Sequence, residues 1–208
     1  MAITHRDRTI VDFRNKMTGG GARSNLFEVN IKYPDIIAAL IGDATGEGEF
    51  LIKSAEIPAS NIGNIPVPFR GRVLPIAGDR TFDPWTVTII NDTNFTIRDA
   101  MEKWSNSIND IQTAQGAVDP ASYQTIATVS QLDRRGFSET DDIQVLRKYV
   151  FSGIYPNVVS SIPLDYGATD QIEEFQVTFN YLYYEIRGGV DGTGTNLTDK
   201  AETAQATG

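Results

Sequence analysis

The stretch GDRTFDPWTVTIIN, residues 78–91, joins a charged turn to a strongly patterned strand. After Pro84, larger apolar side chains alternate with smaller ones, and β-branched residues dominate, as on a pleated, half-buried surface. This period of two predicts a strand that turns one set of side chains toward the core. The predicted core set is Trp85, Val87 and Ile89.

A helix is predicted directly after this strand. Residues 91–94 supply Asn, Asp and Thr, whose side-chain oxygens accept hydrogen bonds from the unpaired first amides of a helix. The apolar residues that follow have the spacing of a helix that packs one face on a sheet. They are Ile97, Ala100, Met101, Trp104 and Ile108. Because a Trp and Met stripe at this spacing is typical of a core, we interpret Met101 and Trp104 as packing residues.

Strand patterns dominate the rest of the chain. Strands are predicted at residues 25–33, 49–57, 67–74, 122–132, 143–155 and 172–185, with a connector at 58–68 and a short helical turn within 35–48. The last strand has an apolar face, expected to hold Phe175, Val177, Phe179, Tyr181 and Tyr183. Its polar face holds Glu174, Gln176, Thr178 and Asn180. The sequence therefore predicts a mainly β (α+β) fold, a sandwich or barrel of antiparallel strands with one flanking α-helix.

Composition divides the chain into three predicted parts. Residues 1–24 form a basic arm, 25–187 form the β domain, and 188–208 form a flexible tail with too few apolar residues to offset the entropy of ordering it. The arm carries a weak helical stripe, formed by Ile3, Ile10, Phe13 and Met17. Such an arm is either a frayed terminus or a segment that orders on an acidic neighbouring subunit.

Charge and residue types argue against several classes of function. The net charge of −9 disfavours binding to nucleic acid, whose phosphates are held by Lys and Arg. Cysteine is absent, and the single histidine, His5, lies in the arm, away from any core site. Adjacent carboxylates at 141–142 and 173–174 would point to opposite faces of a strand, so neither pair forms an acid/base dyad. The residues therefore offer no catalytic constellation and predict no cofactor or metal site, and no apolar run is long enough to span a membrane.

Three segments resemble one known family. The run AGDRTFDPWTVTIINDTNFTIRDAMEKW, residues 77–104, closely resembles the core of the tail tube proteins of contractile-tailed bacteriophages (myoviruses). RSNLFEVNI at 23–31 and FSGIYPNVVSSIPLDYGATDQIEEFQVTFNYLYYE at 151–185 match the same family in the same order. Family members tend to be shorter, so residues 1–22, 35–48 and 187–208 stand outside the resemblance.

The resemblance implies a structural subunit and no enzyme. The subunit would polymerise as stacked hexameric rings, in which strands of neighbouring β-sandwiches join into one continuous barrel. DNA would pass through the lumen during ejection, inside a contractile sheath. The implied partners are further copies of the chain, the tail sheath protein, and the baseplate and tail terminator proteins. The tape measure protein and DNA would pass through the lumen without specific binding. The implied location is the virion, after synthesis and assembly in the cytoplasm of the bacterial host.

Alternatives and site residues follow from the same patterns. A tube subunit of a phage-derived contractile injection or secretion machine would share the fold, and a carbohydrate-binding β-sandwich is a more remote alternative. In the tube interpretation, Glu174, Gln176, Thr178 and Asn180 are expected to face the lumen, where acidic charge would repel DNA. Residues expected at subunit interfaces are Arg6, Arg8, Arg14, Asp43, Glu47, Asp79 and Arg80. The last two are expected to form an ion pair that joins subunits or fixes the turn at 78–80.

Overall fold

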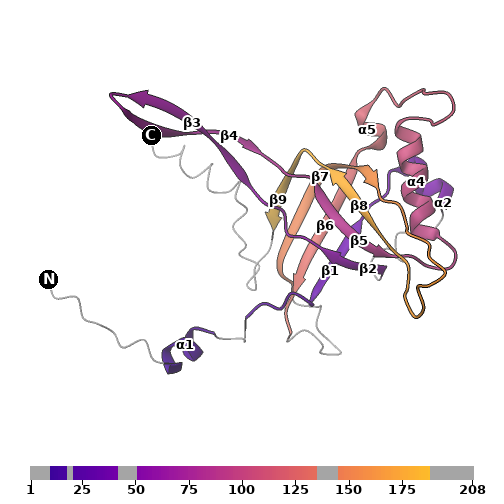
Figure 1. Ribbon diagram of the computed structural model, residues 1–208, viewed down its shortest axis with the longest axis horizontal. Coiled ribbons are helices and arrows are strands. Elements are labelled where there is room, and N and C mark those ends of the chain that lie inside the picture. Colours follow the sequence, from indigo (N-terminus) through magenta and orange to yellow (C-terminus); the bar gives the residue numbers. More distant parts are fainter. Residues whose placement is uncertain (1–9, 18–20, 42–50, 135–144, 188–208) are drawn as a thin grey trace.

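The computed structural model describes residues 10–17, 21–41, 51–134 and 145–187. A curved antiparallel sheet forms the body, and a two-stranded hairpin projects from it (Figure 1). The mainly β, α+β fold expected from the sequence is confirmed. The described elements are α1 (Ile10–Lys16), β1 (Phe27–Ile31), α2 (Asp35–Ile41), β2 (Ile52–Ala55), β3 (Asn61–Phe69), β4 (Arg72–Thr81), β5 (Trp85–Ile90), α4 (Thr96–Ile108), α5 (Pro120–Tyr123), β6 (Thr125–Leu132), β7 (Val145–Val159), β8 (Glu174–Asn180) and β9 (Tyr183–Arg187).

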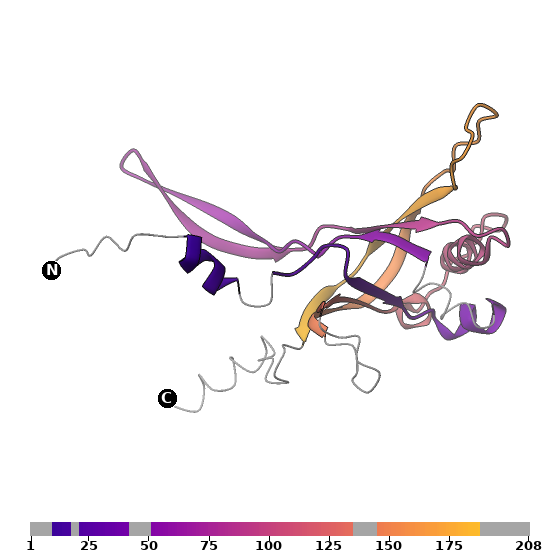
Figure 2. The same cartoon turned by 90° about the horizontal axis from the view of Figure 1, so that it is seen from below.

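The long strand β7 connects the two parts of the sheet. The strand order is β1-β6-β7-β8-β5-β2, and β9 pairs with the first part of β7. β9 lies opposite residues 148–152 of β7, whereas β8 lies opposite residues 155–159. β7 therefore exchanges one partner strand for another midway along its length. Side chains from both parts of the sheet share one hydrophobic cluster, so the exchange curves the sheet around a single core (Figure 2).

Gly153 marks the exchange point on β7. Its φ of 68° lies in the left-handed region, and the pairing of β6 with β7 shifts register at this position. A Cβ atom on Gly153 would lie 2.7 Å from the side chain of Leu182. The backbone N–H of Leu182 donates to Ser152 O at 3.0 Å, which fixes the main chain of Leu182 beside Gly153. Both the backbone conformation and the available space therefore require glycine.

Replacing Gly153 by valine should lower the free energy of unfolding by about 2 to 4 kcal/mol, because a β-branched residue is strained at positive φ and overlaps Leu182. Urea unfolding followed by circular dichroism measures the change. The matched control is Gly167→Val in an exposed loop, where a Cβ would meet its nearest neighbour at 3.4 Å, so a change within about 0.5 kcal/mol is expected. Equal stability of the two variants would refute the role assigned to Gly153.

The core is organised around Trp85. Its ring stacks on Phe151 with centroids 4.6 Å apart, and its Nε1–H donates to Glu56 O at 2.8 Å. α4 lies across one end of the sheet (Figure 1), where the ring of Trp104 approaches that of Phe179 at 6.2 Å between centroids. Five of the sequence-predicted core residues lie in this buried cluster: Trp85, Val87, Ile89, Met101 and Trp104.

The N-cap residue of α4 is Phe95, which is left-handed and makes no side-chain cap hydrogen bond, so the cap lies one residue beyond the predicted 91–94. Of the predicted segment, Asp92 does accept hydrogen bonds from the first residue of the helix. Asp92 Oδ1 accepts a hydrogen bond from the backbone N–H of Thr96, and Asp92 Oδ2 accepts one from the Thr96 hydroxyl, both at 2.9 Å. The buried residues of α4 are Ile97, Ala100, Met101 and Trp104, as the helical spacing predicts. The sequence pattern therefore located both the first turn of this helix and its core-facing side.

Two predictions on either side of Arg70 and Gly71 are wrong. Residues 58–68, expected as a connector, contain most of β3, and residues 67–74, expected as one strand, contain the turn of the β3–β4 hairpin. The expected turn at 78–80 is also wrong, since these residues lie within β4. Proline has no amide N–H to donate, so the prolines in these runs argued against strands. An exposed two-stranded hairpin nevertheless tolerates proline, because both of its strands are edge strands.

The predicted strand 172–185 is two strands, β8 and β9. Phe179 is buried in β8, but beyond Leu182 the core-facing position moves by one residue. Tyr184 packs against the core opposite Phe151, and Tyr183 is exposed. The expectation that Tyr183 shares the apolar face is therefore wrong, because the chain leaves the partners of β8 at Leu182 and pairs with the first part of β7.

Candidate assembly surfaces

The β3–β4 hairpin projects from the body as an isolated two-stranded ribbon (Figures 1 and 2). Every residue of β3 is exposed, and so is every residue of β4 except Gly78. The strands meet at Arg70 (φ 47°) and Gly71 (φ 81°), two left-handed residues as in a type I′ turn. A two-stranded hairpin alone is marginally stable in water, so this one is expected to gain contacts outside its own chain.

One face of the hairpin is apolar along its length. Cross-strand partners share a face, which groups the pairs Ile65↔Ile76 and Val67↔Leu74 with Phe69 near the tip. The exposed fractions of these residues run from 38% for Val67 to 67% for Phe69. The opposite face carries three prolines, small or polar residues and the larger apolar side chain of Val73, which is 62% exposed. An uncovered apolar stripe of this kind is typical of a protein–protein contact.

Prolines limit how another chain can contact the hairpin. Pro66, Pro68 and Pro75 have no amide N–H, so the outer edges of the ribbon have fewer donors for an added strand. The apolar face is therefore the better contact surface. At the neck, Asn61 Nδ2 donates to Asp83 Oδ2 at 2.7 Å and ties the hairpin to the start of β5.

A second projection, residues 160–173, joins β7 to β8 at the end of the molecule opposite the hairpin (Figures 1 and 2). Its base is fixed by Arg98 of α4, whose guanidinium lies over the Phe175 ring at 5.1 Å and donates to Ser160 O at 2.5 Å. Its outer part presents Leu164, which is 82% exposed, and Tyr166, which is fully exposed. A fixed base with an exposed apolar tip again indicates a contact surface.

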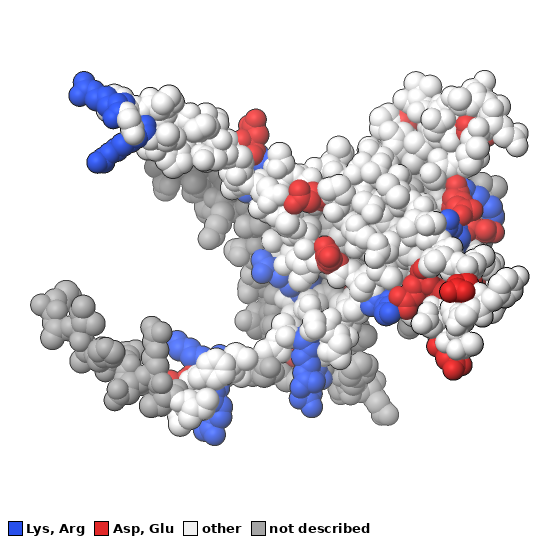
Figure 3. Space-filling view, in the orientation of Figure 1, with Lys and Arg blue, Asp and Glu red and all other residues white. Residues whose placement is uncertain are grey.

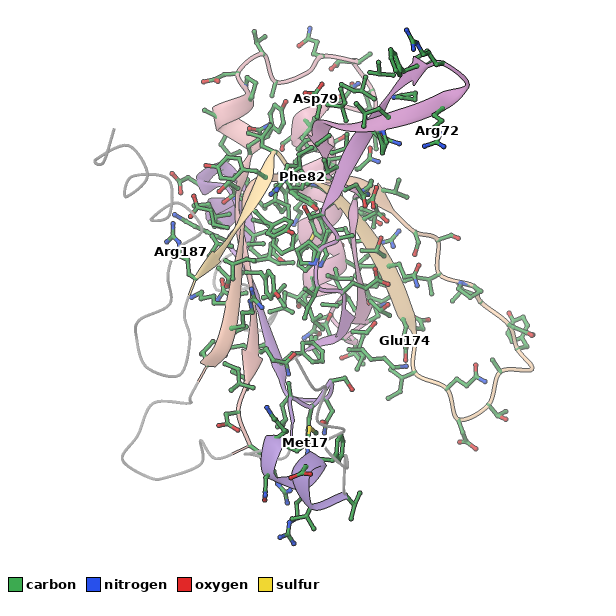
Figure 4. The ribbon with its side chains drawn as sticks, turned by 90° about the vertical axis from the view of Figure 1, so that its left-hand side faces the viewer. Met17, Arg72, Asp79, Phe82, Glu174 and Arg187 are labelled. Atoms are coloured by element: carbon green, nitrogen blue, oxygen red, sulfur yellow. The ribbon has the colours of Figure 1, made fainter. Side chains whose placement is uncertain are left out.

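The polar face predicted for β8 continues onto its neighbours in the sheet. The hydroxyls of Thr86 and Thr178 share a hydrogen bond at 3.1 Å, and Lys53 Nζ pairs with Glu174 Oε1 at 2.6 Å. Asn180 Nδ2 donates to a tyrosine hydroxyl of β7 at 3.3 Å, and Gln176 is exposed. Figure 4 labels Glu174 at the end of β8. The face is hydrophilic, and its carboxylate is balanced by a lysine.

The residues expected at interfaces are spread over several elements. Asp79 and Arg80 are exposed neighbours in β4, so their side chains leave opposite faces of the hairpin neck. No ion pair joins these two described residues within the chain, so the expectation of a pair that fixes the turn is wrong, and the pair between subunits stays a prediction. Arg14 is exposed on α1, which lies apart from the body (Figure 2). The remaining residues lie outside the described ranges: Arg6, Arg8, Asp43 and Glu47.

The arm and the segment 35–48 are described in part. The weak helical stripe of the arm appears as α1, on which Ile10 and Phe13 are exposed, followed by an exposed Met17 (labelled in Figure 4). α2 occupies the first half of 35–48, as the short helical turn predicted there. Residues 1–9, 42–50 and the predicted tail 188–208 lie outside the described ranges.

The pKa shifts belong to structural groups. Burial raises the pKa of the Tyr33 and Tyr181 hydroxyls, which keeps them neutral. Backbone and hydroxyl hydrogen bonds from Thr113, with the amide of Gln112, lower the pKa of Asp110 in an exposed turn. In the part of the chain that the structure describes, no three His, Asp or Glu side chains gather as metal ligands. The same residues include no helix long and apolar enough to cross a membrane.

The hairpin is the candidate contact surface that the sequence interpretation missed. Its signal was the Arg70-Gly71 dipeptide between two runs of similar length and similar apolar content. A glycine in a two-residue connection favours the left-handed conformation of a hairpin turn. Three prolines in the flanking runs weakened that signal, although prolines are compatible with the exposed edges of a ribbon.

The sequence is similar to known tail tube proteins over most of its length. A family model described as phage tail tube protein matches residues 22–187. The chain is 33% identical to the tail tube protein gp19 of Enterobacteria phage T4 over 173 residues, which cover 81% of this chain and 93% of that protein. It is 28% identical to the tail tube protein of Serratia phage KSP90, with 84% and 94% of the two chains covered.

Solved structures of contractile injection systems share the fold at low sequence identity. The tube terminating cap of the anti-feeding prophage gives a TM-score of 0.57 at 18% identity, covering 91% of this chain and all of that one. The sheath/tube terminator of an extracellular contractile injection system gives 0.56 at 15% identity, covering 81% and 97%. The family match over residues 22–187 and the similarity to gp19 show that this chain belongs to the phage tail tube protein family.

Proposed function

We propose that this chain is the structural subunit of a contractile phage tail, polymerising as stacked hexameric rings into the tube through which DNA passes. The observation that carries the proposal is the β3–β4 hairpin, whose apolar face lies outside the core of its own chain. A protein working as a monomer would leave this stripe in water. In a stack of rings, the stripe is covered by a neighbouring copy.

Ring closure is proposed to use the two ends of the strand order. β1 and β2 occupy these ends, and among the described elements each pairs with a single strand. A free strand edge is a template for pairing with another chain, and closing such edges on identical neighbours removes the risk of open-ended aggregation. Pairing of this kind would join the sheets of one ring into a continuous barrel.

The polar face of β5 and β8 is proposed to line the lumen. Its described side chains are mainly hydroxyls and amides, and Lys53 is engaged with Glu174. DNA affinity comes largely from free Lys and Arg that neutralise phosphates. A lumen of this composition would let DNA slide because it offers few cationic groups, with electrostatic repulsion as a smaller contribution.

The proposal extends to partners and setting. The tube would carry the tail sheath protein outside, with baseplate and tail terminator proteins at its ends, and the tape measure protein and DNA would move through its lumen. It would have no catalytic role and no cofactor, and it would be built in the host cytoplasm as part of the virion. Identities of 28% and 33% to phage proteins, against 15% and 18% to injection-system proteins, favour the phage tail over the phage-derived machine.

Placing aspartate at both Val67 and Leu74 should abolish tubes and leave the subunit folded. The two positions face each other on the apolar side of the hairpin, and neither belongs to the core. Each unpaired carboxylate buried at a contact costs on the order of 1 to 3 kcal/mol. Because every subunit of a ring carries both substitutions, the association constant for stacking should fall by at least about 100-fold. Electron microscopy and sedimentation measure assembly, and thermal unfolding measures the fold.

The control for this experiment uses the other face of the same hairpin. Asn64 and Ala77 also face each other across β3 and β4, so aspartate at both adds two facing carboxylates in the same geometry. Tubes are expected from this control. If the Val67 and Leu74 variant also formed tubes of normal length, the apolar face would not be a contact surface.

A further inference from the structure

The tip of the hairpin is cationic as well as apolar. Arg70 and Arg72 flank the turn glycine, and both are exposed. The Arg70 guanidinium lies over the ring of Phe69 at 5.4 Å, which places a positive charge beside an exposed aromatic surface. Figure 3 shows these basic side chains at the extremity of the projection, and Figure 4 labels Arg72 there.

The projection at residues 160–173 has the opposite charge. Asp165 and Asp170 are exposed in it, and the segment contains no Lys or Arg. Asp165 Oδ1 accepts a hydrogen bond from the Gly167 N–H at 2.9 Å, which orders the turn that presents Tyr166. Leu164 and Tyr166 stand beside these carboxylates as exposed apolar side chains. Each projection therefore combines an apolar surface with charge of one sign.

The two projections are placed to meet in a stack. They extend from opposite ends of the molecule, and Figure 2 shows both leaning to the same side of the sheet. In Figure 3 acidic side chains gather over the end that carries residues 160–173, interspersed there with some basic ones. When identical rings stack in a head-to-tail manner, one end of each subunit faces the opposite end of a subunit in the next ring.

We propose that the hairpin tip of one copy docks on the 160–173 projection of a copy in the next ring, with Arg70 and Arg72 against Asp165 and Asp170 and Phe69 against Leu164 and Tyr166. This inference rests on the proposed function, since it names the surface that receives the hairpin in the tube. It also gives stacking a direction. Two hairpin ends repel each other, as do two acidic ends, so rings join only head to tail.

Two charge reversals test the docking. Variant one carries Arg70→Glu and Arg72→Glu, and variant two carries Asp165→Arg and Asp170→Arg. Either variant alone places like charges at every ring contact and should raise the protein concentration needed for stacking by about tenfold or more. Rings of either variant should remain intact, because the altered residues are exposed and outside the core.

Mixing the two variants is the decisive step. The Glu tips of variant one match the Arg projections of variant two, and the Arg tips of variant two match the Asp projections of variant one. Alternating stacks should therefore form in the mixture and in neither variant alone, as measured by sedimentation and negative-stain electron microscopy. Added salt should restore some stacking of each single variant, since it screens exposed like charges.

A matched control and the parent chain separate the possible failures. Lys103→Glu with Arg147→Glu makes the same change in net charge as variant one, at exposed positions outside both projections, and stacking at the parental concentration is expected. Normal stacking of variant one or two, or no stacking in their mixture, would overturn the docking proposal. Failure of the parent chain to form rings or tubes would instead overturn the proposed function.

Discussion

Replacing Trp85 by alanine should destabilise the subunit by about 3 to 5 kcal/mol, the usual cost of removing a buried aromatic side chain. Trp85 is buried where both parts of the sheet meet, stacked on Phe151 and 5.6 Å from the ring of Phe179. Its removal also leaves Glu56 O without the indole donor. The free energy of unfolding of a single domain is commonly about 5 to 15 kcal/mol, so the variant should lose a large part of it.

Chemical unfolding of the isolated Trp85→Ala subunit measures this loss. Tyr166→Ala is the control, because Tyr166 is fully exposed and its truncation should change stability by less than about 0.5 kcal/mol. A destabilisation below about 1 kcal/mol for Trp85→Ala would show that the sheet closes without this anchor.

Replacing Gln176 by lysine should leave tubes intact and strongly slow DNA passage. Gln176 is exposed on the polar face of β8, opposite Thr88 of β5, so the longer side chain has room and the core is untouched. Every ring would add one ammonium group per subunit to the proposed lumen. A protein that contacts about 6 to 10 phosphates loses about 10³-fold or more in DNA affinity as the salt concentration rises. At low ionic strength the added ammonium groups should therefore hold the DNA and slow its passage by at least about tenfold.

Particles that carry the variant tube measure this effect as the rate of DNA ejection at several salt concentrations. Gln112→Lys is the control, since it makes the same chemical change at an exposed position beyond α4 and away from the β8 face. Ejection from that control should match the parent. Normal ejection through intact Gln176→Lys tubes would place the lumen on another face of the subunit.

The sequence predicted β5 and α4 well because both bury one face against the core. Burial of one face imposes a period of two on Trp85, Val87 and Ile89, and a helical period on the residues from Ile97 to Trp104. For the same reason the polar face of β8 was assigned to the correct residues. Which space that face borders depends on neighbouring copies, and the periodicity of one chain carries no information about them.

The hairpin and the end of β8 could not be predicted in the same way. Both faces of β3 and β4 are exposed in the single chain, so no core imposes an alternation on them. At Leu182 the change of face follows from the left-handed bend at Gly153 in β7, which is distant in sequence. The alternation from Phe175 to Tyr183 does not reveal this change of face. To predict it, one would need to know which part of β7 each of these residues pairs with.

Electron microscopy of the purified parent chain tests the central claim most directly. The protein, concentrated at low to moderate salt, should form rings and stacked tubes with a central channel, and averaged end views should show six subunits around it. The β3–β4 hairpin should then bridge successive rings in side views. A protein that remains a monomer at all concentrations, by both imaging and sedimentation, would contradict the assignment of this chain as a self-assembling tube subunit.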